Sequence, residues 1–144
     1  GLPTAIGMAL AQPDITTLCF SGDGSFMMNI QELATLAEEN LNVKVIILNN
    51  NHLGLVRQQQ TLFYKKNLSA VKFQQGVDFA MAAKSMGVNG MNLGQVDNPH
   101  KQLTKALREP GPWVIDIPIS ETEMVFPMVA PGGSNRDMIH GEEQ

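Results

Sequence analysis

The chain has 144 residues, enough for one domain with a buried core. Its composition, with 43% hydrophobic and 17% charged residues, is typical of a globular protein. A net charge of −4 excludes an electrostatic reason to bind nucleic acid or an anionic membrane. No apolar run approaches the ~20 residues that span a bilayer, and no signal peptide is evident. The single cysteine, Cys19, excludes an internal disulfide and favours a reducing compartment, so we expect a cytoplasmic location.

Strands and helices alternate along the sequence. A short helix of small residues is expected at 5–11, and the apolar run at 16–20 predicts a buried strand. After the turn at 22–25, apolar residues at helical spacing predict a helix over 30–39. The run at 43–48 is nearly all apolar and β-branched, as in a strand covered on both faces. In the second half we expect helices at 53–64, 76–86 and 99–108, and strands at 88–93 and 113–119.

This alternation predicts an α/β fold: a doubly wound, mainly parallel sheet with helices on both faces. We expect residues 1–144 to form a single domain, and the opening Gly-Leu-Pro suggests a fragment of a larger subunit. Pro118 predicts that the last strand ends, or runs at a sheet edge, at that point. The segment after Ser120 is expected to cross a surface, and the acidic end from Gly141 to be frayed.

Two polar segments follow two of the expected strands, at the sheet end where ligands of such folds bind. Gly22 and Gly24 allow a sharp turn close to a ligand, and Ser25 offers an N–H and a hydroxyl. The helix that follows favours a phosphate, which Asp23 would repel unless a cation lay between them. Mg²⁺ resolves the conflict, because it binds carboxylates and phosphates together, and Asn50 adds a neutral oxygen ligand.

Each segment alone is a common turn, so the pair carries the argument. Asp23 and Asn50 are 27 residues apart, about what one strand–helix–strand crossover requires. The alternative is a Rossmann-like binding or regulatory module whose turns imitate the motif. A nicotinamide-binding domain is disfavoured because no G-x-G-x-x-G follows the first strand.

The GDG, apolar spacer and NN together resemble the thiamin-diphosphate fingerprint of decarboxylases, carboligases and transketolases. In that family the aspartate and the second asparagine bind the metal that holds the diphosphate, so the resemblance implies that Asp23 and Asn50 are metal ligands. It implies that the backbone carbonyl of His52 is the third ligand. The other positions that the family would place against the cofactor are Gly22, Gly24, Ser25, Gly54 and Leu55.

Three longer stretches resemble acetohydroxyacid synthase (acetolactate synthase) large subunits: GLPTAIGMALAQP, LGLVRQQQTLFY and FPMVAPGGSN. The second is the most specific, since glyoxylate carboligase, benzoylformate decarboxylase and pyruvate oxidase are expected to lack it. The resemblance implies a transferase of branched-chain amino-acid biosynthesis that condenses pyruvate with a second 2-keto acid, with loss of CO₂. Another thiamin-diphosphate carboligase or decarboxylase is the alternative.

The resemblance also implies partners outside the chain. The family's activating glutamate belongs to an N-terminal domain reached across a subunit interface, and FAD binds mainly through a middle domain. We therefore expect no catalytic residue here, no activity from the chain alone, and a homodimer or larger assembly, with a small regulatory subunit left open. The compartment implied is the bacterial cytoplasm, or a plastid or mitochondrion. Many members carry tryptophan where this chain has Gln59, which implies that Gln59 shapes the pocket for the second keto acid.

Overall fold

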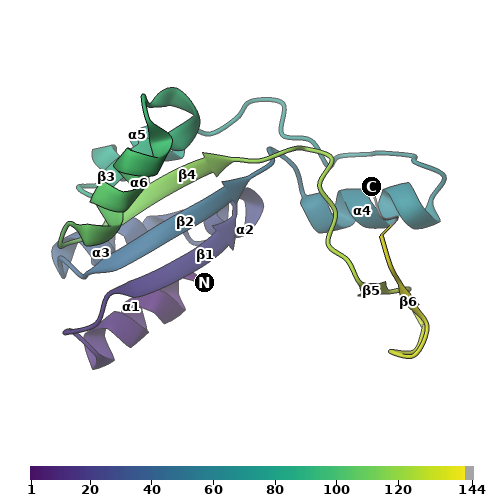
Figure 1. The fold of residues 1–144 in the computed structure, drawn as a ribbon, viewed down its shortest axis with the longest axis horizontal. Coiled ribbons are helices and arrows are strands. Elements are labelled where there is room, and N and C mark those ends of the chain that lie inside the picture. The colour runs from purple at the N-terminus through teal and green to yellow at the C-terminus, as the bar shows by residue number, and fades with distance from the viewer. Residues whose placement is uncertain (142–144) are drawn as a thin grey trace.

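A parallel sheet with helices packed against it forms the body of the computed structural model, which describes residues 1–141 (Figure 1). Its four strands lie in the order β1-β2-β4-β3, and each neighbouring pair is parallel. The predicted fold class is therefore confirmed, whereas the prediction for the acidic chain end concerns residues outside the described range. The strands are β1 (Thr17–Gly22), β2 (Val43–Asn49), β3 (Asn89–Asn92) and β4 (Trp113–Pro118), with a short antiparallel pair β5 (Met128–Val129) and β6 (Met138–Ile139).

Two predictions for the first half of the chain are wrong in detail. Residues 22–25 do not form a simple turn, because α2 begins at Asp23 directly after β1. The single helix expected over 30–39 is divided into a 3₁₀ turn and α3. The helices are α1 (Leu2–Ala11), α2 (Asp23–Met27), α3 (Leu33–Glu38), α4 (Gly54–Phe63), α5 (Phe79–Ser85) and α6 (Pro99–Arg108), and the 3₁₀ turns are η1 (Ile30–Glu32) and η2 (Leu93–Gln95).

In the second half, the helix expected from residue 76 begins only at Phe79. The Asp78 side chain sets this start, because its carboxylate accepts a hydrogen bond from a backbone N–H of the first turn. Val77, which lies inside the expected range, precedes the helix and is 38% exposed. Strand β4 does end at Pro118, as predicted, but it lies inside the sheet rather than at its edge.

The hydrophobic core fills the face of the sheet that α1, α2, α3 and α5 cover. Alternate residues of β2 point into it, among them Val45 and Ile47, which are fully buried. Phe26 of α2 meets Phe79 of α5 edge to face, with ring centroids 5.6 Å apart. The core thus holds α2, the helix that begins at Asp23, against α5. This packing fixes the position of Asp23 at the carboxyl end of the sheet.

The opposite face of the sheet is only partly covered. Lys44 points to this side, and its Nζ donates to the backbone carbonyls of Glu109 and Gly111, just beyond α6. Over β1 the same face is open, so that Leu18 and Phe20 are 50% and 63% exposed. Helix α6 therefore shields the β4 side of the sheet and leaves the β1 side apolar and accessible.

Helix α4 lies beyond the carboxyl ends of the strands, away from the sheet, and a long connection leads from it to α5 (Figure 1). The C-terminal segment runs back beside it. Gln58 of α4 joins the two, because its side chain donates to the carbonyl of Val125 at 2.8 Å and accepts from its N–H at 2.9 Å. The fully buried Gln58 amide also donates to the sulfur of Met128. We call α4 and this C-terminal segment, residues 54–63 and 120–141, the arm.

Replacing Lys44 by methionine is expected to lower the free energy of unfolding by about 1–3 kcal/mol, because two backbone carbonyls lose their buried donor. Urea unfolding followed by the fluorescence of Trp113, the single tryptophan, measures the change.

The same lysine should make stability depend on pH. Burial lowers the pKa of Lys44, so its charged form opposes folding below that pKa. This cost is removed as the pH rises towards the ordinary value of 10.5, and wild-type stability should rise in that window while the variant's does not. The exposed Lys105, changed to methionine, is the control; equal effects of both substitutions would contradict the prediction.

Candidate functional site

Asp23 stands at the carboxyl end of β1 as the first residue of α2. Its side chain is 4% exposed, and Oδ1 accepts a hydrogen bond from the N–H of Gly24 at 2.7 Å. Oδ2 is also buried and has no hydrogen-bond partner within residues 1–141. A buried carboxylate oxygen without a donor is costly, so this atom is suited to a bound cation.

The segment after β2 is held by two side-chain turns in succession. Asn49 Oδ1 accepts from the N–H of Asn51 at 3.0 Å, and Asn50 Oδ1 accepts from the N–H of His52 at 3.1 Å. Asn51 adopts a left-handed backbone with φ of 56°, a conformation that asparagine tolerates. The buried imidazole of His52 donates from Nδ1 to the carbonyl of Asn50. Three asparagines thus shape the turn at 49–52, which we call the asparagine turn.

A second segment braces the asparagine turn from the side. The N–H of Leu53 donates to the carbonyl of Val71, and the N–H of Phe73 donates to the carbonyl of Asn51. The Asn51 side chain completes the pairing by donating from Nδ2 to the carbonyl of Phe73 at 3.1 Å. Residues 71–73 therefore fix the turn much as a neighbouring antiparallel strand would, with His52 opposite Lys72.

A cavity of about 340 Å³ opens between Asp23 and the asparagine turn, in the size range of small-molecule sites. Its polar wall includes Asp23, Ser25 and Asn49, and its apolar wall includes Leu53 and Phe73. At Gly24 an added Cβ would lie 3.0 Å from Leu53 Cδ2, so the backbone here comes unusually close to the facing wall. Met27 and Met28 also line the cavity and are 41% and 73% exposed.

The structure brings only part of the predicted site onto one cavity wall. Asp23, Gly24 and Ser25 line it, whereas Asn50 and His52 lie on the adjoining turn and their neighbours Asn49 and Asn51 take the wall positions. The two wall asparagines were missed, although three consecutive asparagines after a strand could have indicated them. Gly22 ends β1, Gly54 and Leu55 begin α4, and Leu55 is 59% exposed.

Gln59 lies apart from this cavity, in a surface groove on α4 with Gln60 and Tyr64. Its predicted role in a substrate pocket stays a prediction. Among residues 1–141 no three side chains of His, Cys, Asp and Glu gather as a metal cluster. A cation at Asp23 would therefore take amide, backbone or ligand oxygens as its further donors, the hard oxygen set that Mg²⁺ prefers.

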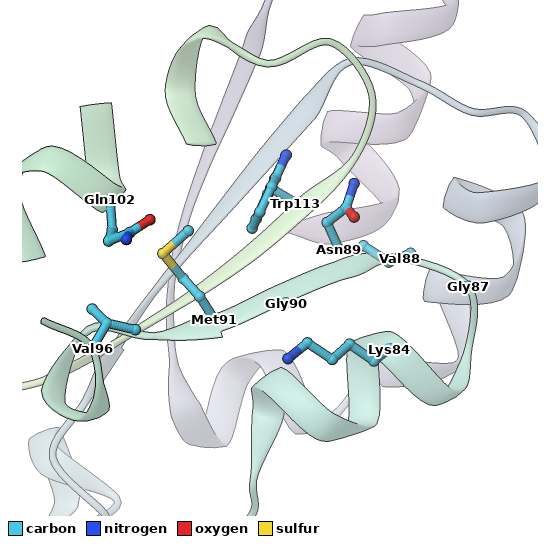
Figure 2. Close-up of a pocket in the computed structure, with 9 residues that line it drawn as sticks. All are labelled: Lys84, Gly87, Val88, Asn89, Gly90, Met91, Val96, Gln102 and Trp113. Atoms are coloured by element: carbon cyan, nitrogen blue, oxygen red, sulfur yellow. The ribbon is translucent and has the colours of Figure 1, made fainter. Parts of the chain in front are cut away.

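A second cavity, of about 500 Å³, lies beside β3, the edge strand of the sheet, and residues of α5 and α6 contribute to its lining (Figure 2). Figure 2 shows Lys84, Gln102 and Trp113 around it, close to the first residues of β3 and β4. The described lining residues include no carboxylate, so this cavity lacks the chemistry of the predicted cation site. Among the described residues, no helix is long and apolar enough to cross a membrane.

The fold and the cavity define a class: an α/β domain with a cavity at the carboxyl ends of its parallel strands. The model of the family "Thiamine pyrophosphate enzyme, C-terminal TPP binding domain" matches residues 1–117. The chain belongs to this family. Thiamine pyrophosphate, the cofactor in the family's name, is the compound called thiamin diphosphate above. Its fold is also similar to the thiamine diphosphate-dependent 4-hydroxybenzoylformate decarboxylase of Rhodococcus jostii RHA1, with a TM-score of 0.73 and 30% identity over 83% of this chain and 23% of that one.

Curated relatives of this chain include acetolactate synthases of several organisms. The isozyme 1 large subunit of Escherichia coli K12 is 47% identical over 96% of this chain and 25% of its own length. The acetolactate synthase of Arthrospira platensis is 46% identical, and the chloroplastic acetolactate synthase 2 of Zea mays is 42% identical, each over 96% of this chain. The chain thus spans about a quarter of the length of the relatives it matches.

Proposed function

We propose that the chain is the diphosphate- and Mg²⁺-binding domain of an acetolactate synthase of branched-chain amino-acid biosynthesis. The observation that supports a cation site is the buried Oδ2 of Asp23, which has no hydrogen-bond donor among the described residues. Asp23, the Asn50 side chain and the His52 carbonyl would hold the metal. Similarity to acetolactate synthases over 96% of the chain supports the enzyme.

The residues of the site have separate tasks in this proposal. Asp23 brings the negative charge that a divalent cation needs, and Ser25 offers an N–H and a hydroxyl to the diphosphate. Leu53 and Phe73 supply an apolar wall that excludes water from the cofactor ring. Thiamin diphosphate, when bound, would supply a nucleophilic ring carbon and a positively charged thiazolium ring that accepts the electron pair released when a 2-keto acid loses CO₂. The chain's contribution is to bind, orient and shield this cofactor.

The whole enzyme would condense pyruvate with a second 2-keto acid, with Gln59 near the acceptor. It would work as a homodimer or larger assembly with the cofactor at the subunit interface and FAD bound mainly by other domains. A cytoplasmic or plastid location is proposed with it. The alternative is a related decarboxylase, which the structural similarity to the Rhodococcus enzyme favours.

The 144-residue chain is expected to bind thiamin diphosphate only when Mg²⁺ is present, and not to form acetolactate from pyruvate. Binding depends on the metal because the cation must offset the repulsion between Asp23 and the diphosphate. Activity is not expected because the resemblance assigns the activating glutamate to a different domain. Isothermal titration with Mg²⁺ and with EDTA measures the first, and a colorimetric acetolactate assay the second. Binding that survives EDTA would contradict the metal site. Turnover by the chain alone would contradict the expectation that activity needs a glutamate from another domain.

A further inference from the structure

Asp116 is a buried carboxylate for which neither the sequence motifs nor the cofactor site accounts. It lies on β4, is 1% exposed, and its Oδ2 accepts from Asn92 Nδ2 of the neighbouring β3 at 2.8 Å. Its Oδ1 has no partner at hydrogen-bond length among residues 1–141. Burial raises the pKa of this carboxyl, and the negative charges of Asp78 and Asp23 raise it further. A sheet built for stability alone would hold an apolar side chain at such a position.

The asparagine turn lies within reach of this carboxylate. In the sheet register Asp116 is opposite Ile47 of β2, and Asn49 is the next residue of β2 on the same face. The side chain of Asn49 lies near the Asp116 carboxyl and lowers its pKa, against the larger effect of burial. Among the described residues no hydrogen bond of normal length joins the two side chains, so Oδ1 of Asp116 remains an open acceptor beside Asn49. Asn49 also lines the cavity beside Asp23. Asp116 thus lies directly behind a residue of the cavity wall.

A carboxylate only accepts hydrogen bonds, so it imposes an orientation on each amide beside it. Asn92 shows the effect: its Nδ2 faces Asp116, and its Oδ1 is thereby directed to accept from the N–H of Gly94 at 2.8 Å. Asn49 resembles Asn92 in its acceptor contact, since its Oδ1 accepts from the N–H of Asn51. The Asp116 carboxylate therefore orients the Asn92 amide directly and has Asn49 as a sheet neighbour, and the oxygens of both amides close turns.

We propose that Asp116 is a positioning residue that fixes the Asn49 amide, and with it the asparagine turn that presents the cation ligands. The proposal rests on the function proposed above for that turn. Asn50 and His52 belong to the turn, so an error in its closure displaces the ligands although Asp116 does not contact the metal. Residues that orient ligands in this indirect way typically change metal affinity by about 10- to 100-fold when replaced.

The test is Asp116→Asn, which keeps the shape and removes the acceptor-only charge. An amide at position 116 must direct an N–H towards one asparagine, which disfavours the native orientation of that amide. We expect Mg²⁺ affinity in the presence of thiamin diphosphate to fall about 10- to 100-fold, while the urea midpoint stays equal or rises because a buried charge is removed. Asp97→Asn, at an exposed acid, is the matched control and should leave both quantities unchanged.

A double-mutant cycle with Asn49→Ala separates positioning from general packing. If Asp116 acts through Asn49, the double variant should bind Mg²⁺ no more weakly than the weaker single variant. Additive losses, unaltered affinity in Asp116→Asn, or an affinity loss matched by an equal loss of stability would overturn the proposal.

Amide hydrogen exchange in the metal-free chain gives a readout that does not depend on the cofactor. Asp116→Asn should accelerate exchange at the N–H of Asn51 and of Gly94, the two groups that the oriented amides bind. If the wild-type chain binds no Mg²⁺ while this acceleration is seen, the proposed function fails and the orienting role stands. Unchanged exchange at both groups would sink the orienting role itself.

Discussion

Replacing Asp23 by alanine should abolish Mg²⁺-dependent binding of thiamin diphosphate, with a loss of affinity of at least about 100-fold. That figure is the upper end of the range for residues that only orient ligands, and a direct carboxylate ligand should exceed it. The domain should stay folded, because the substitution removes a buried oxygen that has no donor within the described residues. Titration calorimetry with Mg²⁺ and thiamin diphosphate, beside a urea unfolding curve, measures both effects.

The control for this substitution is Asp14→Ala, which removes an equal charge from an exposed position before β1. It should leave cofactor binding and the unfolding midpoint unchanged. If Asp23→Ala binds the cofactor as the wild type does, then the residue is not a metal ligand. The Rossmann-like module that only imitates the motif would then be the better description of the chain.

Replacing Gly90 by alanine should destabilise the fold by more than about 3 kcal/mol, beyond the usual cost of overpacking. Gly90 lies on β3 directly against α5, and an added Cβ would come 2.3 Å from the carbonyl oxygen of Ala80 and 2.9 Å from its Cα. Backbone atoms of a packed helix cannot rotate away, so α5 would have to separate from the sheet. Urea unfolding monitored by Trp113 fluorescence would show a lower midpoint, or no folded baseline.

Gly7→Ala is the matched control for the same chemical change. Gly7 is in the middle of α1, where no described atom outside the backbone of its own helix lies within 4 Å of the added Cβ. Helical alanine is favoured over glycine by roughly 0.5–1 kcal/mol, so this variant should be slightly more stable than the wild type. Equal midpoints for the two variants would show that the contact between β3 and α5 is looser than described.

Local patterns predicted most of the fold because they reflect local physics. The apolar run of β2 and the helix that begins at Pro99 have the expected type and nearly the expected bounds. The prediction was least accurate where capping decides a boundary, as at Asp78, or where a glycine pair suggested a turn instead of the start of α2. Both errors concern competition between two short structures that a pattern of apolar residues does not resolve.

The site was predictable only as far as its residues are close in sequence to strand ends. Asp23 and the asparagine turn each follow a strand, and parallel pairing of β1 with β2 brings them together. Phe73 and Asp116 were missed because their positions depend on tertiary structure. In particular, β4 lies between β2 and β3, and no local signal in the sequence indicates that order. Pro118 correctly indicated where this strand ends, but the edge position that it left open is not the one observed.

The pairing of Gln58 with Val125 has a consequence for how the molecule opens. One side chain both donates to and accepts from the same peptide unit, as a neighbouring β-strand residue would. Gln58 is buried, whereas much of α4 around it is exposed, so this contact is a main attachment between α4 and the C-terminal segment. If either one moved away alone, the hydrogen-bonding groups of both would be left without partners. We therefore expect the arm to open as one cooperative unit, with its amides exchanging with solvent while the sheet stays closed.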